Sequence, residues 1–216
     1  MWNRRCLEGV LAWWNLELAE LHPEVEMVGS PNRCLKRLVV EDDNHHLFVI
    51  EQIDQKKAAR KQRIARMVSW FANRGMKGVV PYLCADENRF VVHSQDAFWM
   101  VMPYVKGVEL DRPEYVKDMW RGREAATILG DVRRLGGGLP WRAESFSITR
   151  YVLRMHHDLL QHNPEVLFWL RPVFEWLRQT RFLSTCDGLP RSFCHGDLHP
   201  MNMIWGKDSV NGIIDW

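Results

Sequence analysis

The segment 193–216 constrains the fold and chemistry of this chain more than any other part. It opens with the run FCHGDLHPMN at residues 193–202 and closes with IIDW at 213–216. Between these runs, the short apolar stretches Met203–Trp205 and Gly212–Ile214 flank the turn-forming residues 206–208. Apolar stretches separated by a Gly-containing turn predict a β-hairpin.

Three polar residues lie at the base of this predicted hairpin. Asp197 and Asn202 precede it, and Asp215 follows it. When such a hairpin folds back, Asn202 and Asp215 can share one divalent cation while Asp197 faces a substrate hydroxyl. Phosphoryl transfer needs oxygen ligands for magnesium and a carboxylate that takes up or orients the hydroxyl proton. The alternative interpretation is a buried His195 and two turn-forming Asp residues beside an ordinary hairpin.

The arrangement resembles the catalytic and metal-binding loops of the aminoglycoside phosphotransferase and choline kinase family, small-molecule kinases with a protein-kinase-like fold. Residues 195–197 (HGD) stand where protein kinases have His-Arg-Asp, and residues 214–216 (IDW) match their Asp-Phe-Gly segment. The resemblance implies a catalytic Asp197, magnesium ligands at Asn202 and Asp215, and a loop-bracing role for His195. A zinc site on His195, Asp197 and His199 is the competing interpretation, but no nearby His or Cys cluster supplies further ligands.

The rest of the chain predicts an α+β fold with the two lobes of a kinase. Helical spacing of apolar residues from Leu7 to Leu21 predicts an opening helix that Pro23 ends. An antiparallel meander, a helix and two more strands follow, in the order of a kinase amino-terminal lobe. These elements are expected at 25–28, 35–40, 47–53, 55–74, 90–93 and 98–102.

Beyond this lobe the pattern becomes mostly helical. Helices are expected at 123–135, 148–161 and 166–181, with Pro172 kinking or dividing the last one. The predicted organisation is a nucleotide-binding lobe at 1–102, a hinge at 103–107 and an incomplete, mostly helical catalytic lobe at 108–216.

The resemblance also implies where a nucleotide binds. The loop between the first two predicted strands contains Gly29, Ser30 and Asn32 and corresponds to the loop that covers the nucleotide, although an ordinary hairpin turn would look the same. The hinge corresponds to the segment whose backbone binds the adenine edge. Its expected nucleotide-binding residues are Met102, Pro103, Tyr104 and Val105.

One departure from the family lies on the third predicted strand. The family has a Lys there, paired with a Glu on the following helix, whereas this chain has Glu51 and a helix rich in Lys and Arg. We expect the ion pair to persist with its charges exchanged, so that Arg60 or Arg63 pairs with Glu51 and offers a guanidinium to the phosphates. The alternatives are a solvated basic face with Glu51 pointing elsewhere and, less favoured, a nucleic-acid-binding helix.

A second departure is that the chain stops at Trp216, directly after Asp215. Family members continue with helices that complete the catalytic lobe and form much of the acceptor pocket. The chain is therefore expected to be a fragment or a truncated protein. Apolar surface is expected to be exposed on the 166–183 region and around the terminal hairpin.

Composition narrows the function class. A net charge of +2 gives no overall case for nucleic acid or a membrane surface, and no apolar run is long enough to cross a bilayer. The five Cys residues have no metal-ligand spacing, which favours reduced thiols in the cytoplasm. The expected function is transfer of the terminal phosphate of ATP or GTP to a hydroxyl of a small molecule, with Mg²⁺. The alternatives are a non-catalytic nucleotide-binding protein and an inactive kinase fragment, and the sequence does not identify the acceptor.

Overall fold

The protein packs as two compact units. A computed structural model describes residues 3–27, 34–111, 113–142 and 145–216. The first unit joins Met1–Leu135 with Cys194–Trp216, and the second is Gly136–Phe193. The lobe and hinge boundaries predicted from the sequence stay a prediction.

An antiparallel five-stranded sheet organises the first unit. Its strand order is β1-β2-β3-β5-β4, so that β3 lies in the middle between β2 and β5. β-Branched and aromatic residues are frequent in β3 and β5 and favour the pleated, half-buried conformation. The strands are β1 (Leu18–His22), β2 (Lys36–Asp42), β3 (Leu47–Ile53), β4 (Val92–Ser94) and β5 (Ala97–Pro103).

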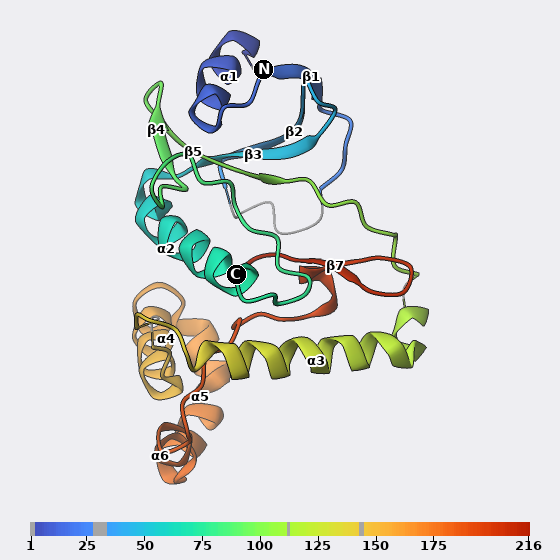
Figure 1. Ribbon diagram of the computed structural model, residues 1–216. Coiled ribbons are helices and arrows are strands. Elements are labelled where there is room, and N and C mark those ends of the chain that lie inside the picture. The colour runs from blue at the N-terminus through green and yellow to red at the C-terminus, as the bar shows by residue number, and fades with distance from the viewer. Residues whose placement is uncertain (1–2, 28–33, 112, 143–144) are drawn as a thin grey trace. The chain divides into compact units, whose positions relative to one another are not determined.

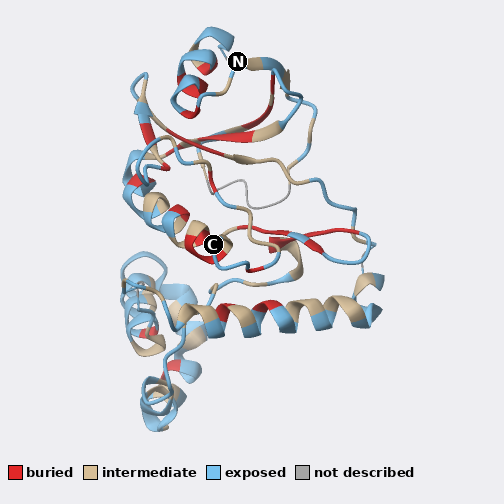
Figure 2. Ribbon diagram, viewed as in Figure 1, coloured by how far each residue is buried: buried red, intermediate tan, exposed pale blue. Residues whose placement is uncertain are grey.

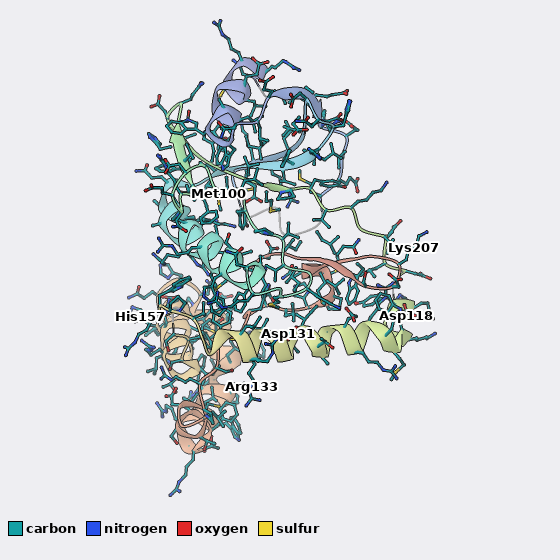
Figure 3. The ribbon with its side chains drawn as sticks, in the orientation of Figure 1. Met100, Asp118, Asp131, Arg133, His157 and Lys207 are labelled. Atoms are coloured by element: carbon teal, nitrogen blue, oxygen red, sulfur yellow. The ribbon has the colours of Figure 1, made fainter. Side chains whose placement is uncertain are left out.

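One helix covers each face of this sheet (Figure 1). Helix α1 (Arg4–Leu11) packs against the face that includes Ile50, and a short 3₁₀ turn, η1 (Ala12–Trp14), continues it. Helix α2 (Gln55–Ala72) packs against the other face, where Met100 is fully buried and lies between β5 and α2 (Figure 3). Alternation of side chains along β3 and β5 produces these two cores.

The prediction of one helix from Leu7 to Leu21 is wrong. Asn15 adopts φ 54°, a left-handed conformation that Asn tolerates, and stops the helical segment. Leu18 and Leu21 then lie on β1 and pack into the α1 core, so their helical spacing is coincidental. The strand predicted at 25–28 is also wrong for residues 25–27, and Val28 lies outside the described residues.

The carboxy-terminal residues return to the first unit as the predicted hairpin. Strands β6 (Met203–Trp205) and β7 (Val210–Ile213) pair antiparallel, and Lys207 lies at the turn between them (Figure 3). A parallel bridge from Val79 to Ile213 ties the hairpin to the segment after α2. Helix α3 (Met119–Gly136), which follows η3 (Glu114–Lys117), contacts the hairpin where the Trp120 and Trp205 rings meet edge to face at 5.7 Å.

The second unit is helical and shallowly packed. It contains α4 (Ile148–His162), α5 (Pro164–Gln179) and α6 (Phe182–Asp187), and α5 runs through Pro172 without dividing. Figure 2 shows these helices mostly as exposed. Phe168 and Trp169 are 68% and 78% exposed, which confirms the apolar surface expected at 166–183.

The terminal hairpin, in contrast to the helices of the second unit, does not expose its apolar side chains. Its apolar residues are buried, and the prediction of exposed apolar surface there is wrong, because α3 and the 76–82 segment cover it. Among the described residues, no helix combines the length and apolar character that spanning a bilayer requires.

Candidate active site

The loop at 195–197 is held by the imidazole of His195. The His195 Nε2–H donates to the Ile214 carbonyl at 3.0 Å, and the Asp197 N–H donates to His195 Nδ1 at 3.4 Å. Together these bonds require the neutral imidazole with its proton on Nε2. Burial lowers the pKa of His195, against the opposing effect of the bond to Ile214, so the neutral form is favoured. The bracing position predicted for His195 therefore agrees with its contacts.

Gly196 permits the sharp turn between these two residues. Its φ is +89°, which L side chains rarely adopt. The turn leaves the Asp197 carboxylate 73% exposed, so a dissolved hydroxyl compound can reach it.

Asn202 links the loop to the hairpin. It lies at the end of a 3₁₀ turn, η4 (Pro200–Asn202), and is 4% exposed. Its Nδ2 donates to the Asp197 carbonyl at 2.9 Å and to Asp197 Oδ2 at 3.2 Å. Two acceptors around one atom identify it as the amide nitrogen, so the Oδ1 atom faces the other way.

Asp215 follows the strand that pairs with the segment after Asn202. The Ile214 N–H donates to the Asn202 carbonyl at 3.0 Å, so residues 202 and 214 lie side by side. Asp215 has φ 60°, a left-handed conformation that Asp tolerates better than most residues. The hairpin backbone thus brings Asp215 next to the segment of Asn202, which is itself bonded to Asp197. That the three side chains form one site stays a prediction.

These groups suit a hard divalent cation. A carboxylate from Asp215 and the amide oxygen of Asn202 are oxygen donors of the kind Mg²⁺ binds. A zinc site is not favoured, since His199 Nδ1 accepts the Met201 N–H at 3.2 Å and caps the η4 turn.

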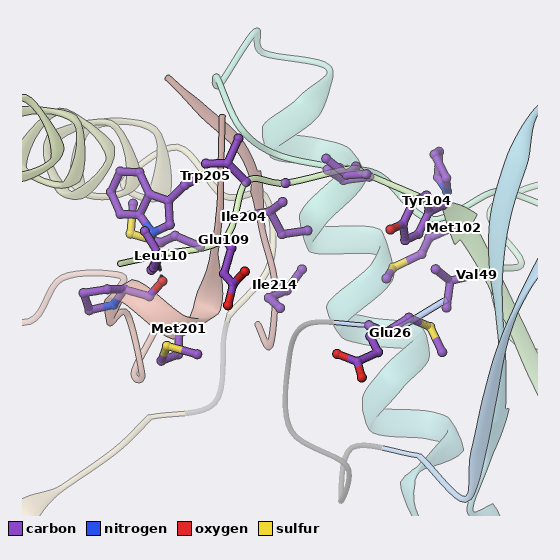
Figure 4. Close-up of a pocket in the computed structure, with 18 of the residues that line it drawn as sticks. Glu26, Val49, Met102, Tyr104, Glu109, Leu110, Met201, Ile204, Trp205 and Ile214 are labelled. Carbon is purple, nitrogen blue, oxygen red and sulfur yellow. Dashed lines mark hydrogen bonds between the residues drawn. The ribbon is translucent and has the colours of Figure 1, made fainter. Parts of the chain in front are cut away.

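A cavity of about 1190 Å³ lies beside this cluster (Figure 4). Val49 and Met102 come from the sheet, whereas Ile204 and Ile214 come from the hairpin, and these apolar side chains line opposite sides. Met201 and Ile214 also line it, and they neighbour Asn202 and Asp215 in the chain.

The predicted hinge residues Met102, Pro103, Tyr104 and Val105 all line the cavity. The Tyr104 N–H donates to the Leu47 carbonyl at 2.8 Å and keeps this segment beside β3. The chain then runs along the hairpin, where the Val108 N–H donates to the Trp205 carbonyl at 2.7 Å.

Glu51 lines the cavity as expected and is 1% exposed. The structure does not bring Arg60 or Arg63 into the described lining, because both are exposed on α2. Arg60 lies two residues after the buried Ala58, and Arg63 lies two residues before the buried Ala65. Two residues correspond to about 200° around a helix, so both arginines lie on the side away from the buried alanines. The predicted loop residues Gly29, Ser30 and Asn32 lie outside the described residues.

Sequence reasoning missed two kinds of lining residue. Arg37 on β2 lines the cavity because it pairs with Glu51 across the sheet. The sequence reveals this pairing only when the residues of β2 and β3 are matched one by one, starting from the 43–46 turn. Glu26, Glu109 and Asp111 also line the cavity, and no sequence pattern signals them.

The fold and this site define a class of protein in which an antiparallel sheet and a carboxylate-bearing hairpin line one cavity. A model of the phosphotransferase enzyme family matches residues 36–216, and the chain belongs to that family. The resemblance found at residues 195–216 is confirmed. A comparison with curated protein sequences gives no match.

Solved structures with the same fold include three antibiotic phosphotransferases. A spectinomycin phosphotransferase in complex with ADP and spectinomycin has a TM-score of 0.60 at 13% identity, over 98% of this chain and 68% of that one. A thermostable mutant of an aminoglycoside phosphotransferase, in a ternary complex with AMP-PNP and hygromycin B, has a TM-score of 0.63 at 12% identity. The match covers 97% of this chain and 70% of that one. A macrolide 2′-phosphotransferase from Brachybacterium faecium has a TM-score of 0.60 at 13% identity, and the match covers 97% of this chain and 70% of that one. These likenesses confirm the α+β, protein-kinase-like fold.

Proposed function

We propose that this protein transfers the terminal phosphate of ATP, or of GTP, to a hydroxyl of a small molecule in a magnesium-dependent reaction. The observation that carries the proposal is the pair of bonds from Asn202 Nδ2 to Asp197, with Ile214 bonded to the Asn202 carbonyl. This linkage sets a carboxylate for the acceptor beside two oxygen ligands for a metal. The free thiols of the described cysteines favour a cytoplasmic location.

The cavity supports a purine site. A flat base fits between the apolar side chains of Val49 and Met102 on one side and Ile204 and Ile214 on the other. Because the Tyr104 N–H faces β3, alternation along an extended segment turns the Pro103 carbonyl and the Val105 N–H away from β3. One acceptor and one donor two residues apart suit the amino group and N1 of adenine, which favours ATP.

Each polar residue has a defined part in the reaction. The Asp197 carboxylate orients the acceptor hydroxyl and takes its proton as the new oxygen–phosphorus bond forms and the bond to the bridging oxygen of the leaving diphosphate breaks. Asn202 and Asp215 would hold Mg²⁺, which when bound neutralises phosphate charge. His195 keeps Asp197 in place, and Asn202 holds the carboxylate through Oδ2.

The test is a transfer assay on the chain with radiolabelled ATP and Mg²⁺ against a panel of hydroxyl compounds that includes aminoglycosides, choline, homoserine and methylthioribose. Transfer of label to one of them, lost in D197A, supports the proposal. Absence of transfer to every acceptor together with absence of nucleotide binding contradicts it.

One observation favours a second candidate, a non-catalytic nucleotide-binding protein. Glu51 occupies the strand position of the family's phosphate-binding Lys, and it is buried at the cavity. Metal-dependent ATP binding without transfer or hydrolysis would favour this candidate.

A further inference from the structure

Arg37 stands directly opposite Glu51 in the sheet. The two residues are Cα partners in the antiparallel register of β2 and β3. Directly opposite residues project from the same face, with Cβ atoms roughly 5 Å apart. The neighbouring pair, Leu38 and Ile50, packs into the α1 core on the other face. Arg37 and Glu51 therefore both project toward the cavity, which both of them line.

The charges of the cavity lining are uneven. Among the described residues that line it, Arg37 is the one base, while Glu26, Glu51, Glu109 and Asp111 are acids. A nucleotide triphosphate would add several more negative charges. A buried carboxylate such as Glu51 is itself costly unless a cation stands beside it. The negative charge of the nucleotide and the buried carboxylate of Glu51 both require a nearby cation, and Arg37 is placed to supply it.

Arg37 is already oriented by the backbone. Its Nη2 donates to the Met27 carbonyl at 3.1 Å, and the side chain is half-buried. A guanidinium has five N–H donors in a rigid fork, and this geometry matches the oxygens of a carboxylate or of a phosphate. Arg60 and Arg63 have no such position, because they are exposed on α2.

We propose that Arg37 is the phosphate-binding cation of this nucleotide site and that Glu51 is its counter-ion, so that the positive charge has moved from β3 to β2. The assignment rests on the proposed function, and it names the group that anchors the phosphates. It explains how a carboxylate can stand at residue 51 without expelling the nucleotide.

The experiment measures binding of MgATP and of adenosine to the chain by calorimetry. R37Q removes the charge but keeps a donor for the Met27 carbonyl, and we expect it to weaken MgATP binding about 10- to 100-fold while adenosine binding is unchanged. R37K keeps the charge without the fork and should fall between R37Q and the wild type. K36Q, on the exposed opposite face of the same strand, is the matched control and should bind MgATP like the wild type.

A second pair of variants guards against loss of folding in R37Q. In the E51Q background no buried carboxylate is left behind, so R37Q/E51Q is compared with E51Q, and the same selective loss of MgATP binding is expected. Equal MgATP affinity in R37Q and the wild type, or in R37Q/E51Q and E51Q, overturns the assignment alone. A wild-type chain that binds neither adenosine nor MgATP overturns the proposed function and this assignment with it.

Discussion

At Asp197 the backbone is held from both sides while the carboxylate remains exposed. Its N–H donates to His195 and its carbonyl accepts from Asn202. A side chain on so fixed a backbone can meet an acceptor without the loop first becoming ordered. This arrangement suits a reaction in which positioning supplies much of the rate.

We predict that D197N lowers the rate of phosphate transfer by roughly 10²- to 10⁴-fold, because an amide cannot take the hydroxyl proton. Binding of MgATP should change little, since residue 197 faces the acceptor. Steady-state transfer assays and calorimetry separate the two effects. D208N, in the exposed turn of the hairpin, should behave as the wild type. Undiminished transfer in D197N would rule out this role.

His195 predicts a pH dependence of stability. Its pKa in the folded chain is lowered from the ordinary value of 6.5, mainly by burial, so the unfolded chain binds the proton more readily. The contribution of His195 to the free energy of unfolding is fully present above pH 6.5, and it is lost as the pH falls toward the lowered pKa.

Denaturant unfolding of the wild type and H195Q between pH 5 and 8 measures this effect, and the wild type should lose more stability on acidification. The raised pKa values of His22, bonded to Glu41 and Glu24, and of His45, bonded to Glu41, act in the opposite direction and are common to both proteins. H157Q, at an exposed position of α4, is the control. Parallel pH profiles for the wild type and H195Q would contradict the prediction.

At the scale of elements, the segment after β5 depends on one close approach. A Cβ added at Gly107 would lie 2.7 Å from Ile204 Cγ2 and 3.3 Å from the Trp205 carbonyl oxygen. Ile204 lines the cavity, so this contact joins the segment to the wall of the proposed purine site.

We therefore expect G107A to lower the free energy of unfolding by about 1–3 kcal/mol and to weaken adenosine binding, because Ile204 must move. Thermal unfolding and calorimetry test both effects. G122A, in α3 with open space around it, should instead stabilise the helix by up to about 1 kcal/mol. Unchanged stability in G107A would show that the segment yields without strain.

The elements also show what a sequence can and cannot predict. Helix α2 follows from its capping Asp54 and a run without helix breakers, and the terminal hairpin follows from its short apolar stretches and turn. The expected opening helix is too long because Leu18 and Leu21 stand at helical spacing, which a regular strand does not share. A register shift between Leu18 and Glu20 lets both pack against the α1 core from β1, and no local pattern signals that shift.

The candidate site also contains residues that the local sequence predicts and one that it does not. Asp197, Asn202 and Asp215 are near neighbours across one hairpin, so local sequence predicts their meeting. Arg37 reaches the cavity only through the register of β2 on β3, a pairing that local patterns do not specify.

At the scale of the whole molecule, the two units differ in how deeply they are packed. In the described part of residues 136–193, the buried apolar side chains are Val152 and Phe174, whereas the first unit has two continuous cores on its sheet. Few buried contacts imply local opening at low free energy.

We predict that amides of α4, α5 and α6 exchange with deuterium faster than those of β3 and β5. Hydrogen exchange followed by mass spectrometry measures this directly. Helix α2, which packs against the sheet, is the internal control and should be protected like the strands. Equal protection of both units would show that further packing covers the helices of residues 136–193.

The ring of Trp216 lies between two others. It stacks on Phe71 of α2 with centroids 5.6 Å apart, it meets His195 at 4.6 Å, and its Nε1 donates to the Ile213 carbonyl at 3.1 Å. A tilt of α2 cannot leave this indole in place, and a displaced indole disturbs the imidazole that holds Asp197. Helix α2 and the loop at 195–197 are thus coupled through one ring, and the difference in fluorescence emission between the wild type and W216F would report whether they move together.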